Sequence, residues 1–578
     1  MALERFSNLV EMFFARAAAK GDAPFLWAKI NGAWMSTSWR AAAEQVASLA
    51  AALRAMGLNA GDRVILVSEN RPEWCIADLA IMAAGCVTVP AYTSNTERDH
   101  THVVENSGAC AAIVSTAKLA QPLLPALARS SGCDRLIAIE PLGKKRIGTV
   151  AIYQWDELIA THPADVAGCA AGATFTRDDL ACIIYTSGTG GAPRGVRQHH
   201  GAILQNVAAP MEVIETDFGM GDEVFLSLLP LSHAYEHSAG QYFPIGCGGQ
   251  IYYAESIEKL GANLEEVRPT IMVVVPRLFE LLRTRILKAV EKQGVIPRWL
   301  FGRAVALGPG PHRLADKPLD LLLDATVRKK IAARFGGRIK AMVSGGAPLN
   351  PDVGNFFASF GITLLQGYGQ TEAGPIISCN RPRAGLKMDT VGPALLGCEV
   401  RIADDGEILV RGENVMHGYW RNDAETARVL IDGWLHTGDI GKLDERGRLL
   451  ITDRKKDIIV TDKGDTIAPQ RIEAMLTLEP EIGQAMVTGD RRPYLVGLVV
   501  PDAEWAGEQP AGVDLQRGVM AAVDRVNAGL SVTERVRRVL IADEPFTIEN
   551  GAMTPSLKVR RHVLRERYGA RLDALYRA

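Results

Sequence analysis

Residues 183–196 have the composition of a loop that binds phosphate groups. They read Ile-Ile-Tyr-Thr-Ser-Gly-Thr-Gly-Gly-Ala-Pro-Arg-Gly-Val, so a β-like run opens directly into glycines and hydroxyl side chains before a proline and a cation. Glycines let the backbone approach a ligand closely, and successive amide N–H groups in such a turn cradle phosphate oxygens. No Gly-Lys-[Ser/Thr] ends the loop, which excludes the usual P-loop. We therefore expect a phosphate-binding loop of another kind, with an ordinary strand-to-helix connection as the alternative.

Two later segments that contain glycine also follow predicted strands. Residues 344–348 read Ser-Gly-Gly-Ala-Pro, and residues 366–372 read Gln-Gly-Tyr-Gly-Gln-Thr-Glu. Open α/β sheets bind ligands where their parallel strands end, so both segments are candidates for one binding site. Tyr368 offers a flat aromatic face, Thr371 a hydroxyl group, and Glu372 a carboxylate of the kind that Mg²⁺ prefers.

Three further segments carry polar side chains that suit ligand binding or catalysis. Residues 229–237 contain two histidines and one glutamate, but the lack of a third metal ligand argues against zinc. Asp439 follows a tight glycine turn, where a carboxylate can accept hydrogen bonds from both hydroxyl groups of a ribose. Lys558 lies in the basic segment 554–561, whose plainer interpretation is the solvated start of a helix.

The overall composition is that of a large globular protein without an excess of charge. The 578 residues exceed what one hydrophobic core supports, so at least two domains are expected. A net charge of −2 argues against a nucleic-acid partner, because no overall positive field collects phosphates. The nine cysteines form no Cys-x-x-Cys pair, so we expect neither disulfides nor zinc, and a cytoplasmic location fits. No window of eighteen apolar residues predicts a transmembrane span.

The order of strands and helices predicts an α/β fold built on doubly wound parallel sheets. From about residue 60, short β-branched runs such as residues 63–68, 135–139 and 271–275 alternate with helical stretches such as residues 276–293. Strands interleaved with helices indicate parallel sheets covered on both faces. The other expected elements are strands at residues 112–115, 223–228 and 339–344 and a helix at residues 39–56.

After about residue 385 the pattern changes to a small β element and then to a smaller α+β unit. Residues 399–402 and 407–410, joined by Asp-Asp-Gly, predict a hairpin, and another strand is expected near residues 449–453. The charged residues 453–457, Asp-Arg-Lys-Lys-Asp, are a plausible boundary between two domains. The expected domains are a large N-terminal domain, residues 1–455, and a smaller mobile C-terminal domain, residues 456–578.

In their order along the chain, these six segments resemble the signature motifs of the adenylate-forming superfamily of acyl-CoA synthetases, adenylation domains and luciferases. The resemblance covers nearly the whole chain and is greatest to bacterial long-chain fatty acyl-CoA synthetases. That branch is indicated by Val-Pro-Arg-Leu-Phe-Glu at 275–280, a helical insert near 280–335, Asp-Arg-Lys-Lys-Asp at 453–457 and Phe-Thr-Ile-Glu-Asn-Gly at 546–551. It implies ATP-dependent activation of a fatty acid to an acyl-adenylate, followed by transfer to coenzyme A.

The resemblance also implies roles for individual residues. The β- and γ-phosphates would be held by Thr186, Ser187, Gly188, Thr189, Gly190 and Arg194, and Mg²⁺ by Thr186 and Glu372. The adenine slot would be formed by Gly345, Gly346, Ala347, Gln366, Gly367 and Tyr368, with Tyr368 stacked on the base. Thr371 would contact the α-phosphate, Asp439 and Arg454 would bind the ribose, and His233 would border the acyl carboxylate.

Two lysines carry the expected mechanism. Lys558 would be the catalytic cation, because an ammonium group near the carboxylate and the α-phosphate stabilises charge that grows in the transition state. Lys456 occupies the position of the hinge about which the small domain of this family rotates between the two half-reactions.

Two departures from the family pattern stand out. Gly190 and Arg194 replace the usual threonine and lysine of the phosphate loop. Arginine keeps the positive charge but presents a planar fork in place of a point charge. Residues 462–465, Asp-Lys-Gly-Asp, replace the more usual Gly-Gly-Glu-Asn.

A long-chain fatty acid with ATP and coenzyme A is the leading substrate set. The alternatives are a fatty acyl-AMP ligase that loads a carrier protein, an aryl or medium-chain acyl-CoA ligase, and a non-catalytic scaffold that binds adenylate. The C-terminal helix predicts a face of Leu564, Tyr568, Leu572 and Leu575 among arginines, which would either contact the inner face of a membrane or pack on its own domain. Chain length, pathway and oligomeric state, a homodimer included, stay open.

Overall fold

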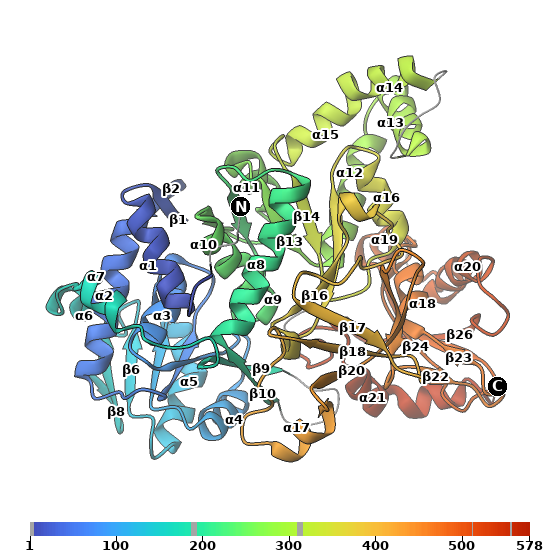
Figure 1. Cartoon of the computed structure of the whole chain (residues 1–578). Coiled ribbons are helices and arrows are strands. Elements are labelled where there is room, and N and C mark those ends of the chain that lie inside the picture. The colour runs from blue at the N-terminus through green and yellow to red at the C-terminus, as the bar shows by residue number, and fades with distance from the viewer. Residues whose placement is uncertain (1–4, 187–192, 309–315, 511, 555–557, 578) are drawn as a thin grey trace.

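The computed structural model describes residues 5–186, 193–308, 316–510, 512–554 and 558–577. Two eight-stranded sheets form the body of the molecule, and a small sheet and the C-terminal region lie to one side (Figure 1). This confirms the predicted α/β class. Among the described residues, no helix combines the length and the apolar character needed to cross a membrane.

The first sheet has the strand order β10-β9-β4-β3-β5-β6-β8-β7 and is parallel except at its two edges. Its strands are β3 (Arg63–Val67), β4 (Val87–Pro90), β5 (Ala111–Val114), β6 (Arg135–Ala138), β7 (Arg146–Ile147), β8 (Val150–Gln154), β9 (Leu180–Thr186) and β10 (Arg194–His199). The helices of this part are α1 (Leu9–Lys20), α2 (Trp39–Ala55), α3 (Pro72–Ala83), α4 (Glu97–Ser107), α5 (Ala117–Arg129), α6 (Trp155–Thr161) and α7 (Val166–Gly172).

The second sheet has the order β16-β15-β14-β13-β11-β12-β1-β2, again with antiparallel edges. Its strands are β1 (Pro24–Ile30), β2 (Ala33–Ser38), β11 (Val224–Ser227), β12 (Gln250–Tyr253), β13 (Ile271–Val274), β14 (Ala341–Ser344), β15 (Leu364–Gly369) and β16 (Ile376–Cys379). The associated helices are α8 (His200–Asp217), α9 (Ala234–Glu236), η1 (His237–Tyr242), α10 (Phe243–Cys247), α11 (Leu260–Val267), α12 (Pro276–Glu291), α13 (Val295–Leu307), α14 (Lys317–Leu323), η3 (Asp324–Arg328), α15 (Lys329–Arg334) and α16 (Pro351–Ala358).

A small antiparallel sheet follows, as the hairpin pattern predicted. It consists of β17 (Cys398–Ile402), β18 (Glu407–Gly412), β19 (Leu430–Ile431), β20 (Trp434–Leu443) and β21 (Leu449–Arg454), with η4 (Thr371–Ala373), η5 (Pro382–Ala384) and α17 (Asp423–Val429) nearby in the chain. Asp439 of β20 pairs with Arg454 of β21. This pairing brings two of the expected nucleotide-binding residues together across one ladder.

The C-terminal region is an α+β unit with its own core. It contains β22 (Ile459–Val460), β23 (Thr466–Ile467), α18 (Pro469–Leu476), β24 (Ile482–Thr488), β25 (Leu495–Pro501), α19 (Ala503–Glu508), α20 (Leu515–Asn527), β26 (Val536–Ile541) and α21 (Arg561–Ala574). Leu564, Tyr568 and Leu572 of α21 are buried against a core that includes Phe546 and Leu498. The apolar face of this helix therefore packs on its own domain, so it is not the free membrane-facing surface that we considered.

All nine cysteines are free, and six of them are buried. Burial raises the pKa of Cys133 and of Cys379 to about 12, because a thiolate is poorly solvated in these positions. The absence of disulfides agrees with the scattered spacing of the cysteines in the sequence.

Candidate active site

A cavity of about 1290 Å³ lies where the strand ends of the body, the small sheet and the C-terminal region meet. Its wall includes Thr186 and Arg194 from the β9–β10 pair, Glu372 after β15, Asp439 from β20, and Lys558 from the loop before α21. The six segments singled out in the sequence all contribute to this wall. They are far apart in the chain, and the fold brings them to one place.

The residues expected to form the adenine slot lie where β14 and β15 end. These strands pair in parallel, so the loop after Ser344 and the residues from Gln366 onward open on the same edge. Gly346 has φ +83°, a conformation that side chains rarely adopt. A Cβ on Gly345 would lie 3.0 Å from the ring of Tyr235, so this turn packs tightly against an aromatic side chain.

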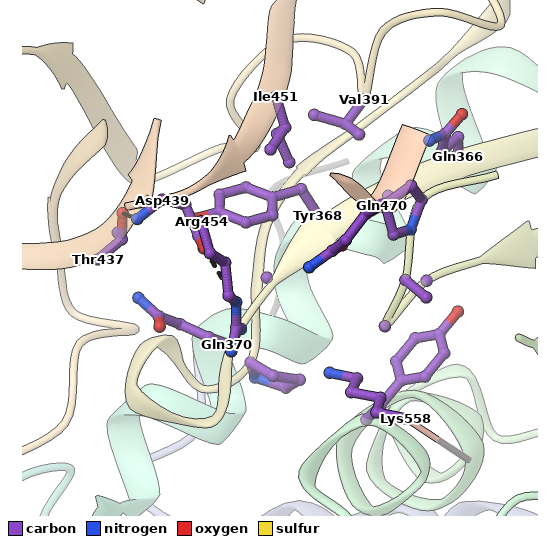
Figure 2. A pocket seen from close by; sticks show the side chains of 18 of the residues that line it. Gln366, Tyr368, Gln370, Val391, Thr437, Asp439, Ile451, Arg454, Gln470 and Lys558 are labelled. Carbon is purple, nitrogen blue, oxygen red and sulfur yellow. Dashed lines mark hydrogen bonds and ion pairs between the residues drawn. The ribbon is translucent and has the colours of Figure 1, made fainter. Parts of the chain in front are cut away.

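Tyr368 and Arg454 hold the carboxylate of Asp439 between them (Figure 2). The hydroxyl of Tyr368 donates to Oδ2 at 2.7 Å, and Nε of Arg454 lies 3.1 Å from Oδ1. Burial and the neighbouring carboxylate raise the pKa of the Tyr368 phenol well above its usual value, so it remains a donor. The residues expected to bind adenine and ribose therefore form one hydrogen-bonded unit.

Lys558 extends its ammonium group into the cavity (Figure 2). Burial and, to a smaller extent, the positive charge of Arg454 lower the pKa of Lys558 to about 8, against the opposing effect of Asp439 and Glu372. Burial, with the charge of Lys558 nearby, also lowers the pKa of His233 to about 4. His233 is therefore neutral at physiological pH and can accept or donate a hydrogen bond beside a cationic lysine.

Tyr419, which the sequence analysis did not identify, lies between Glu372 and Arg194, the cation of the expected phosphate loop. The hydroxyl of Tyr419 donates to Oε1 of Glu372 at 2.8 Å. Arg194 lies over the ring of Tyr419, with its guanidinium carbon 4.6 Å from the ring centre, and forms an ion pair with Glu425. Tyr419 and Glu425 carry no motif signal, because their roles arise from contacts between distant segments.

The two histidines of residues 229–237 have separate surroundings. His233 borders the cavity, but His237 is fully buried and its Nε2 lies 2.9 Å from Oδ2 of Asp78. Glu236 is also fully buried, accepts from the hydroxyl of Ser227 at 2.6 Å, and has its pKa raised by burial to about 8. These side chains therefore have separate partners and do not converge on a common point.

Asp178, His199 and His417 do lie close enough for a shared ion, with candidate ligand atoms within 4.8 Å of one another. However, the two imidazole rings are stacked at 4.0 Å with their planes 10° apart. The ligand lone pairs of parallel rings lie in separate planes and do not aim at one ion. Both ring nitrogens of His199 also lie against backbone carbonyls, at 2.8 Å from Arg177 and 3.2 Å from Val415. We assign this cluster a packing role.

The residues present fit a nucleotide with a divalent cation. Oε1 of Gln366 and Nε2 of Gln370 are buried polar atoms of the cavity wall with no hydrogen-bond partner among the described residues. Buried polar atoms normally have a partner, so these two suit an adenine or phosphate group in the cavity. Thr186 and Glu372 supply the oxygen donors that Mg²⁺ prefers.

Part of the cavity wall is apolar. It is formed by side chains of α8, η1, α10 and the second sheet, among them Val213, Ile214, Ala239, Phe243, Ile271, Val273 and Ile376, and by Leu395 from the segment before β17. Water bound along such a surface is readily displaced by hydrocarbon. The cavity therefore combines polar side chains suited to phosphates and a carboxylate with apolar side chains suited to a hydrophobic group.

The structure brings most of the expected site residues together. The expected residues that line the cavity are Thr186, Arg194, His233, Gly345, Gly346, Ala347, Gln366, Gly367, Tyr368, Thr371, Glu372, Asp439, Arg454, Lys456 and Lys558. Ser187, Gly188, Thr189 and Gly190 lie outside the described residues. Gln470 of α18 is an additional wall residue, and it comes from a helix that no motif marked.

An α/β fold whose cavity gathers phosphate-, ribose- and acid-directed side chains defines an adenylate-forming enzyme. The sequence matches the family described as AMP-binding enzyme over residues 13–420, and the AMP-binding enzyme C-terminal domain over residues 456–578. The chain therefore belongs to the AMP-binding enzyme family, and it is an AMP-forming adenylating ligase.

Individual relatives cover the chain almost completely. The long-chain-fatty-acid–CoA ligase FadD15 of Mycobacterium tuberculosis is 32% identical over 98% of this chain and 97% of its own length. The peroxisomal long chain acyl-CoA synthetase 7 of Arabidopsis thaliana is 33% identical over 94% and 81%. Among solved structures, the adenylation domain of the carboxylate reductase from Mycobacterium chelonae has a TM-score of 0.79 at 22% identity, covering 100% of this chain and 92% of that one, a likeness of fold.

Proposed function

We propose that this enzyme converts a long-chain fatty acid, ATP and coenzyme A into acyl-CoA, AMP and pyrophosphate. The observation that carries the proposal is that Lys558, Glu372 and Asp439 line the same cavity as a group of apolar side chains. The two relatives named above as long-chain ligases or synthetases support the substrate class.

In the first half-reaction, a carboxylate oxygen of the fatty acid attacks the α-phosphorus of ATP and the bond to pyrophosphate breaks. The protein contributes position and charge, because nucleotidyl transfer needs little covalent chemistry from side chains. We assign Lys558 to the oxygens of the carboxylate and the α-phosphate, and Asp439 with Arg454 to the ribose. Thr186 and Glu372 would hold Mg²⁺, which would neutralise phosphate charge when bound.

In the second half-reaction, the sulfur of coenzyme A attacks the acyl carbonyl and the bond to AMP breaks, with loss of the thiol proton. Lys558 occupies the cavity in the observed arrangement, and an incoming thiol needs access to the same carbonyl. We propose that residues 456–578 form a mobile domain that rotates on residues 1–455 about Lys456, which lies exposed in the turn between β21 and β22.

A ligase that passes its acyl group to a carrier protein has the same first half-reaction and a different acceptor. The experiment that separates the two measures AMP release with fatty acids of rising chain length, using coenzyme A or a phosphopantetheinylated carrier as the acceptor. We expect coenzyme A to support turnover and long chains to give the highest kcat/KM. A preference for aryl or medium-chain acids, or for the carrier, would replace the proposed substrate set.

A further inference from the structure

A helical arm formed by α13, α14, η3 and α15 projects from the body of the molecule (Figure 1). Its base is anchored, because Phe301 is buried and stacks against Phe360 of the body with ring centres 5.1 Å apart. Nε of Arg328 also donates to the carbonyl of Ser359 at 2.8 Å. The arm is thus a fixed projection with one side packed on the body.

The outer side of the arm exposes large apolar residues. Val295 is 82% exposed, Ile296 72% and Trp299 56% in α13, and Leu321 is 70% exposed in α14. In α13, Val295, Trp299, Gly302 and Ala306 follow the i, i+4, i+7, i+11 spacing of one helix face, and all are exposed. This face lies opposite the packed face that contains Phe301 and Ala304, so α13 is apolar on both sides.

Positive charge surrounds this apolar surface. The described residues of the arm, 295–308 and 316–334, contain seven basic and three acidic side chains, whereas the whole chain has a net charge of −2. Arg298 and Arg303 flank the exposed stripe of α13, and neither has an ion pair with any residue that the structure describes. Two of the acidic residues, Asp320 and Asp324, are paired with Arg328.

We propose that this arm is a docking surface for an anionic lipid bilayer. A helix with exposed valine, isoleucine and tryptophan beside arginines has the composition of helices that lie in the membrane interface. An arm that projects from the body can contact a planar bilayer, and the net positive charge of the arm is attracted to anionic headgroups. A like-with-like contact between the arms of two copies is disfavoured, because both arms are positive.

The position of the arm relative to the cavity gives the docking a use, which rests on the proposed function. A single helix, α12, leads from β13 to the arm, and Ile271 and Val273 of β13 are among the apolar side chains that line the cavity. Long-chain fatty acids partition into bilayers. Docking through the arm would keep the enzyme beside its substrate without a membrane-spanning segment.

The test is flotation of the full-length protein with vesicles, a measurement that does not require turnover. The vesicles contain phosphatidylglycerol mixed with phosphatidylcholine, or phosphatidylcholine alone. We expect binding to the anionic vesicles at low salt, weaker binding at high salt, and little binding to phosphatidylcholine alone. The paired substitutions Ile296→Ser with Trp299→Ser, and Arg298→Glu with Arg303→Glu, should each weaken lipid affinity at least about tenfold.

Matched controls are available elsewhere on the surface. Ile30 and Met35 are both 56% exposed, so Ile30→Ser with Met35→Ser controls for loss of exposed apolar side chains. Lys118 and Lys145 are exposed, so Lys118→Glu with Lys145→Glu controls for charge reversal. Both controls should bind vesicles as the wild type does, and all variants should keep the wild-type melting temperature.

Three results would overturn the proposal. One is that the wild-type protein fails to float with anionic vesicles at low salt. Another is that the arm variants float as well as the controls, which would move lipid binding to another surface. The third is a concentration-dependent dimer, seen by sedimentation velocity and lost in the Ile296→Ser, Trp299→Ser variant, without vesicle binding. That result would make the arm a protein interface.

Discussion

Lys558 is held in the cavity at a cost to its charged form. Burial and Arg454 lower its pKa to about 8, and the mechanism that we propose needs the ammonium form. We therefore expect kcat/KM for ATP in the adenylation half-reaction to fall as pH rises above about 8, because the charge is then lost. Bound phosphates favour the ammonium form, so the corresponding decline of kcat should begin at a higher pH than the decline of kcat/KM. Isotope exchange between ATP and pyrophosphate measures both profiles.

Arginine does not titrate in this range, so Lys558→Arg is the control for that profile. The decline of the rate above pH 8 should be absent in this variant, whatever the absolute rate of the variant. If the decline persists in Lys558→Arg, it reports the ionisation of another group.

The two half-reactions separate the role of Lys558 from a general structural role. Lys558→Ala should slow adenylate formation by about a hundred- to a thousand-fold, the usual effect of removing one charge-stabilising donor from a preorganised site. Transfer from a supplied acyl-adenylate to coenzyme A should change little, because Lys558 is assigned only to the first step. An equal loss in both half-reactions would contradict this assignment.

Tyr419 fixes one carboxylate oxygen of Glu372, and we expect it to position the other oxygen for Mg²⁺. Tyr419→Phe removes a hydrogen bond to a charged group, a change of about 1.5–3 kcal/mol, so the Mg²⁺ concentration for half-maximal adenylation should rise roughly ten- to a hundredfold. Magnesium titration of the pyrophosphate exchange rate measures this.

Tyr185 provides the matched control for Tyr419. It is buried, its hydroxyl donates to Oδ1 of Asn106 at 2.7 Å, and Tyr185→Phe should leave the magnesium dependence unchanged. If Tyr419→Phe titrates with magnesium as the control does, then Tyr419 is a packing residue only.

At the residue scale, motif spacing predicted the members of the cavity wall better than their partners. Glycine turns and the residues beside them identified Tyr368, Glu372 and Asp439, because such turns follow strand ends in this fold class. The pairing of Arg194 with Glu425 could not be predicted, since an ion pair between segments 231 positions apart leaves no local pattern. The same holds for the contact of Tyr419 with Glu372.

The turn between β21 and β22 is the element on which the proposed domain rotation depends. The amide groups of Asp457 and Ile458 both donate to the carbonyl of Arg454, at 2.9 and 3.0 Å, and Lys456, within the turn that these bonds close, is exposed. Lys456→Pro fixes one backbone dihedral and restricts the preceding residue. It should spare adenylation and impair thioester formation, measured as two half-reactions.

Lys456→Ala removes the same side chain and keeps the backbone free, so it should retain both half-reactions. A thioester rate in Lys456→Pro as high as in Lys456→Ala would mean that the rotation uses another residue. Impairment of adenylation to the same degree would mean that the turn supports the observed arrangement and not the movement.

At the element scale, the alternation of β-branched runs with helices was enough to predict the body. The expected strand at residues 63–68 is β3 (Arg63–Val67), and the expected helix at 276–293 is α12 (Pro276–Glu291). The π-helical element η1 (His237–Tyr242) was not predicted, because its hydrogen-bond pattern depends on packing around buried polar groups. For the apolar face of α21, contact with a membrane and packing on its own domain were both open until the core beneath it was known.

At the scale of the whole molecule, Asp78 connects α3, a helix beside the first sheet, to η1, a helix beside the second sheet. It lies fully buried on α3 and its Oδ2 accepts from His237, Gln241 and Tyr242 of η1, at 2.9, 2.8 and 2.6 Å. Burial opposes ionisation of Asp78, but the charge of His237 and these hydrogen bonds outweigh it, so the pKa of this carboxyl is lowered. The carboxylate therefore stabilises the folded protein at neutral pH.

Asp78→Asn should lower the free energy of unfolding by about 3 kcal/mol, because it breaks a buried charge network. A group with a depressed pKa contributes stability that is lost as pH falls through its folded-state value, so the difference between wild type and variant should shrink in acid. Denaturant unfolding at several pH values measures this.

Asp22→Asn is the control, because Asp22 is exposed on the surface, and this variant should be as stable as the wild type. If Asp78→Asn loses the same stability at every pH, the charge of Asp78 is not what stabilises the fold.

Cys379 lies in the wall of the cavity in which a reactive mixed anhydride would form. Burial raises the pKa of Cys379 to about 12, so at neutral pH this position presents a thiol and almost no thiolate to the activated acyl group. We therefore expect little self-acylation at Cys379, which leaves the intermediate for an external acceptor.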